Sequence, residues 1–202
     1  MVSYIQSYDI KANVQILYGR IIKERMQMGG LKMRLRRLEE KDCPLMLEWM
    51  HDTNVVRNLK NNFSDKKLED CIIFVKNSMT DSDKHFAIVD INDEYMGTVS
   101  LKNINSNSKS AEFAITIRRS AMGNGYSSYA MKKIIDKAFY EYGLKVVYWY
   151  VHKNNIRAIR FYQKMGYTQV SMEDIKKLGI VTERTDANAM NWYYVCKSKL
   201  EE

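Results

Sequence analysis

The chain contains a glycine-spaced turn between an apolar run and an amphipathic run, and this turn restricts its fold more than any other feature. The turn covers residues 122–125, after the apolar run 111–117 and before the run 126–142. The first run resembles a strand and the second has the spacing of a helix. Backbone N–H groups at such a turn can face a pyrophosphate, and glycine lets the phosphate approach closely. The sequence therefore predicts a phosphate-binding unit.

A second strand-to-helix unit follows further along the chain. The β-type run 146–151 leads to Asn155, and the helix-type run 156–164 begins directly after it. Asparagine is a favoured residue at a helix N-terminus, because its side chain accepts a hydrogen bond from the first turn. The helix carries Tyr162, whose phenol can donate a proton. The two units together combine a phosphate-binding turn with a candidate acid.

The remaining runs predict a mixed α/β domain. We expect Asp42 to cap a first helix with Pro44 in its first turn, and Ser64 to cap a second helix over 68–79. Alternating runs bounded by polar turns predict the strands, which cover residues 33–38, 85–91, 95–104, 111–117, 146–151, 167–170 and 192–197. The expected architecture is a mostly antiparallel central sheet of about six to seven strands flanked by helices.

The first 32 residues differ from the rest. Their apolar positions recur at helical spacing among basic side chains, so residues 1–32 are expected to be a basic amphipathic extension and residues 33–202 the domain proper. Three roles stay open for the extension: a surface that binds a membrane or a partner, a helix packed on the domain, or an appendage from an upstream start codon. A homodimer also stays open.

Composition excludes several classes of protein. The net charge is +8, but residues 1–37 carry a basic surplus of six, so the body of the chain is nearly neutral and nucleic-acid binding is not expected. No apolar run is long enough to cross a membrane, and no secretion signal is visible, which favours a cytoplasmic protein. The three cysteines lack the spacing of a disulfide framework or a zinc site, and no metal is expected.

The order of these elements resembles that of the GNAT superfamily of acetyl-CoA-dependent N-acetyltransferases. The likeness rests on residues 123–125 at the turn and on the run 155–167, Asn-x-Arg-Ala-Ile-x-Phe-Tyr ending in Gly-Tyr, and it covers about residues 33–200. Within the superfamily, the chain is most similar to the branch of ribosomal-protein N-terminal, spermidine and amino-sugar acetyltransferases. Sugar-directed members carry a Leu-Glu-Trp near the first helix, as this chain does at residues 47–49.

The resemblance implies acetyl-CoA as cosubstrate and a sheet whose strands 111–117 and 146–151 part to admit pantetheine. The implied cofactor-binding residues are Ile115, Ile117, Met122, Gly123, Asn124, Gly125, Tyr126, Ser127, Asn155 and Tyr162. The chain departs from the family pattern at two positions. Relatives often have Gln or Arg where this chain has Ser120, and a basic residue where it has Met122. We therefore expect weakened phosphate binding, with Arg118 or Arg119 as compensation.

The resemblance also assigns chemical roles. Tyr162 occupies the family's acid position, where it would protonate the coenzyme A thiolate, although its ring could equally serve packing alone. Glu112 is the candidate base, since related enzymes sometimes have a Glu here, and the alternative is a surface charge. His85 and His152 are weaker candidates for the base. Trp49 and His51, with Glu112, are the expected contacts of the acceptor substrate.

The sequence therefore predicts an N-acetyltransferase that acts on a primary amine of a small molecule. A nucleotide-linked amino sugar is the preferred acceptor. A polyamine is less favoured, because only scattered carboxylates, such as Asp52, Glu69 and Asp70, are available to bind it. Two alternatives stay open: acetylation of protein N-termini, and a non-catalytic module that binds acyl-CoA for regulation.

Overall fold

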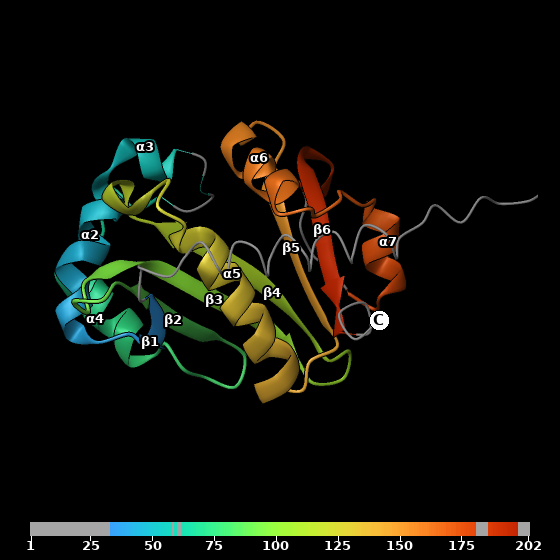
Figure 1. Ribbon diagram of the computed structural model, residues 1–202, viewed down its shortest axis with the longest axis horizontal. Helices are drawn as coiled ribbons and strands as arrows, with labels where there is room; N and C mark the ends of the chain where they lie inside the picture. The colour runs from blue at the N-terminus through green and yellow to red at the C-terminus, as the bar shows by residue number, and fades with distance from the viewer. Residues whose placement is uncertain (1–32, 58, 60–61, 181–185, 198–202) are drawn as a thin grey trace, which may run out of the picture.

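The chain folds around one six-stranded sheet, shown in a computed structural model (Figure 1) that describes residues 33–57, 59, 62–180 and 186–197. The expected extension, residues 1–32, lies outside the described residues. Neighbours in the sheet follow the chain order, and every pair is antiparallel except β4 with β5. The strands are β1 (Arg34–Arg37), β2 (Lys84–Val89), β3 (Tyr95–Asn105), β4 (Ser110–Ile117), β5 (Val146–His152) and β6 (Met190–Cys196).

Helices cover both faces of the sheet. The helices are α2 (Cys43–His51), α3 (Thr53–Val56), α4 (Leu68–Lys76), α5 (Tyr126–Asp136), α6 (Ile156–Lys164) and α7 (Met172–Lys177), and a π-helical turn, Lys137–Glu141, extends α5. Helices α5 and α6 pack on one face, which we call the α5/α6 face. The opposite face carries α2 and α4 over β2 and β3, and α7 over β5 and β6. Among the described residues, no helix is long and apolar enough to span a bilayer.

Alternation along β4 determines which side chains belong to which face. Ala111, Phe113 and Ile117 join the core beneath α5, whereas Glu112 points to the opposite face. The same period puts Val147, Trp149 and Val151 of β5 on the α5/α6 face. Mixed α/β architecture with a mostly antiparallel sheet is thus confirmed.

Two predicted helix caps do not make the expected side-chain bonds, although Asp42 does stand at the N-cap position of α2. The buried Asp42 makes paired hydrogen bonds of 2.7 Å with Arg36 and accepts from the Glu39 amide, so it belongs to the 3₁₀ turn before α2 and gives α2 no side-chain cap. Ser64 bonds to Asn62, four residues before α4 begins, and the Asp70 side chain caps α4 by accepting from the Lys67 amide. Competing partners for a polar side chain decided both cases.

The late part of the chain also differs from expectation. The strand expected over 167–170 is reduced to one antiparallel bridge between Val170 and Trp192. The chain then forms a helix, α7, that was not among the predicted elements. Ser171 and Asp174 form a capping box at its start, a signal that the sequence displays. The helix 68–79 ends earlier than expected, at Lys76.

Candidate active site

Strands β4 and β5 form a fork. They pair at Ser110 with Val146, Ala111 with Val147 and Glu112 with Tyr148, and no further pair follows although both strands continue. Beyond this vertex, β4 keeps only β3 as a neighbour and β5 keeps only β6. The expected parting of the two strands is confirmed. Because the strands are parallel, α5 and α6, which follow them, both begin at the open end of the fork (Figure 1).

The free edge of β4 inside the fork contains two of the expected cofactor contacts. Ile115 and Ile117 pair with Val99 and Gly97 of β3, and their other side faces the gap left by β5. An unpaired strand edge offers backbone donors and acceptors to an extended ligand with amide groups. The fork therefore provides a slot in which an extended ligand can add to β4 as a strand does.

The glycine turn directs backbone amides toward the open end. Gly123 and Gly125 have φ of +85° and +84°, and Gly125 is the N-cap residue of α5. No atom lies within 4 Å of where a Cβ on Gly123 would sit, so backbone conformation, not crowding by the protein, accounts for this glycine. Positive φ at these positions turns successive N–H groups toward one side, which suits an anion.

Met122 already has an acceptor for its amide within the protein. Its N–H donates to the Arg119 carbonyl at 3.2 Å, and its side chain packs partly on the core beneath α5. This bond would have to break before the Met122 amide could bind phosphate, and its expected role stays a prediction. The first amides of α5, at Tyr126 and Ser127, have no acceptor within the helix. The available amides run from Gly123 to Ser127.

Arg118 is not available to bind phosphate either. Its buried guanidinium donates to both Glu48 oxygens, at 3.0 and 2.8 Å, to Glu94 at 2.7 Å and to the Tyr95 carbonyl at 2.9 Å. These bonds tie α2 to the end of β4. Arg119 is the exposed arginine of the pair, with Asp52 at 4.0 Å. Of the two expected compensating residues, only Arg119 keeps a free face beside the turn.

Tyr162 lies in an aromatic cluster on the α5/α6 face. Its ring is 5.5 Å from that of Trp149 and 5.1 Å from that of Tyr193, measured between centroids. Burial is the main cause that raises the pKa of the Tyr162 phenol well above its usual value, and neighbouring Tyr193 and Tyr167 add to the rise. The raised pKa keeps this phenol protonated at neutral pH.

Glu112 lies at the vertex on the opposite face. Its carboxylate accepts from Asn103 Nδ2 at 3.0 Å and Tyr150 Oη at 3.1 Å, and Lys102 Nζ is 3.3 Å away. Only 7% of the residue is exposed. A buried carboxylate with three donors is satisfied without a ligand, and its position at the last β4–β5 pair puts it beside the fork. Glu112 and Tyr162 therefore flank the vertex from opposite faces.

The remaining predicted residues divide into those that help shape the site and those that do not reach it. Asn155 caps α6, accepting from the Ala158 amide at 3.2 Å, as expected for its local role. Trp49 is buried in the core beneath α2 and α4, and its Nε1 donates to Tyr95 Oη. These are the contacts of a core residue. His51 is exposed at the end of α2, with Nε2 3.0 Å from the Lys66 carbonyl.

Neither weaker candidate for the base lies at the vertex. His85 is on β2, which β3 and β4 separate from β5. Its Nδ1 is 2.7 Å from Ser100 Oγ, and its ring packs on Phe74. Burial lowers the pKa of His85. His152 is exposed at the end of β5, and its Nδ1 accepts from the Asn154 amide.

Sequence reasoning missed the side chains that surround the two central residues. Trp149 and Tyr193 flank Tyr162, and Lys102, Asn103 and Tyr150 hold Glu112. Period-two alternation in 146–151 could have assigned Trp149 to the face of Val147. The others depend on the register between strands, which no local pattern reveals.

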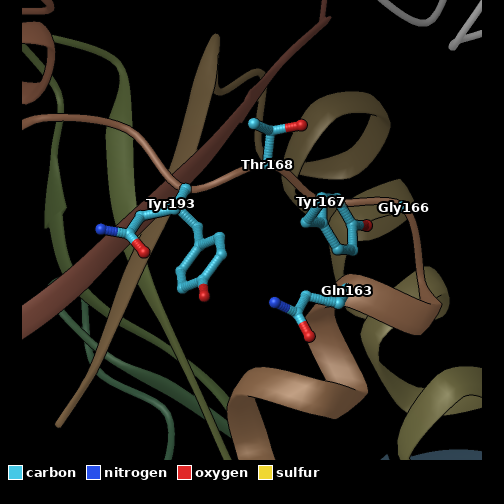
Figure 2. Close-up of a pocket in the computed structure, with 6 residues that line it drawn as sticks. Gln163, Gly166, Tyr167, Thr168 and Tyr193 are labelled. Carbon is cyan, nitrogen blue, oxygen red and sulfur yellow. The ribbon is translucent and has the colours of Figure 1, made fainter. Parts of the chain in front are cut away.

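The surface beside the aromatic cluster is hollowed. A pocket of about 320 Å³ is lined by Gln163, Gly166, Tyr167, Thr168, Gln169 and Tyr193. Figure 2 shows Tyr193 on one side of this pocket, with Tyr167 and Gln163 on the other. Its lining carries no charged side chain. Within the described part of the chain, no group of three or more histidine, cysteine or acidic side chains could hold a metal ion.

Comparison with known proteins defines the class. The family model for the acetyltransferase (GNAT) domain matches residues 32–168, and the chain therefore belongs to the GNAT acetyltransferase family. Members of this family are N-acetyltransferases, which agrees with the activity expected from the two motifs.

Individual relatives are distant. Spermidine N(1)-acetyltransferase of Escherichia coli K12 is 29% identical over 67% of this chain and 73% of its own length. The acetyltransferase PseH of Campylobacter jejuni is 26% identical over 76% of this chain and 93% of its own length. A crystal structure of Vibrio cholerae spermidine N-acetyltransferase with CoA and spermine matches with a TM-score of 0.69 at 20% identity, covering 85% of this chain and 99% of that one. That last likeness confirms the fold.

Proposed function

We propose that the chain transfers the acetyl group of acetyl-CoA to a primary amine of a small molecule, by direct attack within a ternary complex. The observation that carries this proposal is the fork: an unpaired β4 edge, a glycine turn at its open end and Tyr162 beneath its vertex. The backbone around Ile115 and Ile117 would bind pantetheine, and the amides from Gly123 to Ser127 would bind the pyrophosphate.

The placement of Glu112 and Tyr162 supports a division of labour between the two faces. The amine would enter from the face of Glu112, which would take its proton, directly or through water. The lone pair of the amine nitrogen would form the C–N bond while an electron pair of the thioester carbonyl moves to its oxygen. When that pair returns, the C–S bond breaks and sulfur takes the proton of Tyr162. The products are an amide and coenzyme A, and solvent exchange restores both side chains.

The partners of the carboxylates near α2 affect which class of acceptor the site can bind. Glu48 is already paired with Arg118, and Asp52 accepts from the Asn54 amide and has Arg119 within 4.0 Å. These contacts leave little unpaired negative charge to bind a polycation. A nucleotide-linked amino sugar is the preferred acceptor, because binding it does not need a cluster of unpaired carboxylates. Trp49 would position α2 for the acceptor, and His51 at the end of that helix would contact it.

A polyamine is the second candidate. The relatives with spermidine acetyltransferase names support it, whereas the arginine-paired carboxylates weigh against it. Acetylation of protein N-termini remains the alternative acceptor class from the sequence.

Release of free thiol from acetyl-CoA tests the proposal. We expect release with at least one nucleotide-linked amino sugar and little with spermidine or N-terminal peptides. Faster release with spermidine would make a polyamine the proposed acceptor instead of the sugar, and the proposed acetyltransferase activity would still stand. Acetyl-CoA binding by calorimetry with no release from any amine in the panel would instead favour a regulatory module. No binding of acetyl-CoA would remove the proposal altogether.

A further inference from the structure

Two of the three tryptophan side chains have a hydrogen-bond acceptor for the indole N–H, and the third has none among the described residues. Trp49 Nε1 donates to Tyr95 Oη at 3.1 Å, and Trp192 Nε1 donates to the Ala187 carbonyl at 3.2 Å. Trp149 Nε1 is buried and has no hydrogen-bond partner among the residues that the structure describes. A buried donor without an acceptor is costly, and each such group in a folded protein calls for an explanation.

Trp149 lies at the vertex of the fork. It is the first residue of β5 after the last β4–β5 pair, and its indole is 5.7 Å from the ring of Phe113, which holds the equivalent place on β4. The indole is also 5.5 Å from the ring of Tyr162, the proposed acid. The unpaired N–H therefore belongs to a side chain that stands just past the vertex of the fork. This side chain lies beside Tyr162, the residue proposed to face the thioester sulfur.

The surroundings of Trp149 supply no adequate acceptor. Tyr167 packs on it edge to face at 4.8 Å and Tyr193 stacks on it at 5.7 Å, between centroids. Aromatic rings offer an N–H only a weak interaction with their π electrons. The pocket of Figure 2 is lined by Tyr167 and Tyr193 but not by Trp149.

We propose that Trp149 Nε1 donates a hydrogen bond to the thioester carbonyl oxygen of acetyl-CoA. This inference rests on the proposed function. The carbonyl oxygen and the sulfur are bonded to the same carbon, so a sulfur beside Tyr162 brings the oxygen near the neighbouring indole. An indole only donates, and it therefore matches an oxygen acceptor. The oxygen gains negative charge when the amine attacks, and the hydrogen bond becomes stronger in the transition state than in the ground state.

The same bond would separate substrate from product. Free coenzyme A has a thiol where acetyl-CoA has the carbonyl, so the indole N–H loses its strong acceptor once the acetyl group leaves. Trp149 would thus be a catalytic residue that also favours acetyl-CoA over coenzyme A.

The indole ¹H–¹⁵N resonances of the full chain test the proposal directly. The Trp49→Phe and Trp192→Phe variants identify two of the three signals, so the third belongs to Trp149 even if a Trp149 variant does not fold. We expect acetyl-CoA to move the Trp149 signal downfield and coenzyme A to leave it nearly unchanged. The Trp49 and Trp192 signals, whose N–H groups are already paired, serve as internal controls.

The outcomes separate this inference from the proposed function. If both ligands bind by calorimetry and the Trp149 signal does not move, or moves equally with both, the indole does not bind the thioester oxygen and only this inference is lost. If neither ligand binds, the proposed function is lost with it.

Trp149→Phe gives a second measurement, because it removes the N–H and keeps an aromatic ring. We expect its preference for acetyl-CoA over coenzyme A to fall about 5- to 10-fold, and kcat to fall on the order of 100-fold. A purely structural role would weaken binding of both ligands alike. An unchanged ratio of the two affinities would therefore overturn the proposal.

Discussion

At the residue scale, the site depends on polar groups whose surroundings differ sharply over a short distance. Glu112 has three donors around its carboxylate on one face of the sheet. Tyr162 lies on the other face, where its described side-chain neighbours are aromatic rings. Hydrogen-bond donors satisfy the carboxylate, and apolar surroundings keep the phenol protonated. The two residues thus flank the vertex in different environments.

Replacing Tyr162 by Phe tests the acid. Loss of the phenol should lower kcat on the order of 100- to 1000-fold, with acetyl-CoA affinity nearly unchanged because the ring remains. Tyr167→Phe is the matched control, since it also removes a buried hydroxyl from the aromatic cluster. Steady-state kinetics with calorimetry measures both, and equal turnover in the two variants would exclude Tyr162 as the acid.

The two adjacent arginines make a second test. Arg118→Met should lower the free energy of unfolding by about 1 to 2 kcal/mol, because it removes the bonds that tie Glu48, Glu94 and the Tyr95 carbonyl together. Arg119→Met should leave stability unchanged and weaken acetyl-CoA binding several-fold, by about 1 kcal/mol at low salt. Denaturant unfolding and calorimetry at two salt concentrations separate these effects. A loss of stability in Arg119→Met would contradict the assignment.

At the element scale, the fork works because two parallel strands pair only at their beginnings. Each strand keeps an outer neighbour, so the opening leaves one free edge on each strand without unfolding the sheet. Both following helices then begin at the open end, where their N-terminal amides favour negative charge. The glycine turn completes this arrangement by setting the direction of the amides before α5.

Gly123→Ala tests the turn as an element. A positive φ costs a non-glycine residue about 1 kcal/mol or more, and relaxation of this strain would redirect the amides, so acetyl-CoA should bind about 10-fold more weakly. Gly143→Ala is the matched control: its φ is +63°, its Cβ would also have no neighbour within 4 Å, and it lies after α5 at the far end from the turn. Both variants should lose similar stability in thermal unfolding. Equal acetyl-CoA affinity in both would contradict a role for the turn in binding.

At the scale of the whole molecule, buried tyrosines make folding stability depend on pH at the alkaline end. Burial raises the pKa of four phenols well above the usual value near 10, those of Tyr95, Tyr148, Tyr162 and Tyr167. Above about pH 10 the unfolded chain loses phenol protons that the folded chain keeps, so folding stability falls as the pH rises. Below that pH these groups are neutral in both states, and they cause no dependence.

Thermal unfolding between about pH 8 and pH 11 measures this effect. The melting temperature should be steady at the lower end and decline above about pH 10. Tyr162→Phe should decline less steeply than the parent chain, because one of the responsible phenols is gone. An equally steep decline would mean that Tyr162 ionises in the folded protein as readily as in the unfolded one. The raised pKa also predicts that kcat stays constant up to about pH 10.

The local part of the fold was predictable from the sequence. The bounds of α6, the Asn155 cap and the turn at Gly123 and Gly125 follow from side chains a few residues apart, and the structure agrees with them. Asp42 and Ser64 were misjudged, although they are typical cap residues. A side chain of this kind bonds to the best partner within reach, and for Asp42 that partner is Arg36 on the neighbouring strand.

The sequence by itself determined the order of the strands β1 to β5 and of α5 and α6, the glycine turn and the family of the protein, because each depends on spacing along the chain. Only the tertiary structure decided where β4 and β5 part, that Arg118 is bound to Glu48 and Glu94, and that the buried N–H of Trp149 has no partner in the described part of the chain. These features depend on strand register and on helices that meet from distant segments. Periodicity assigns a residue to a face of its strand, but it does not say which residue lies opposite.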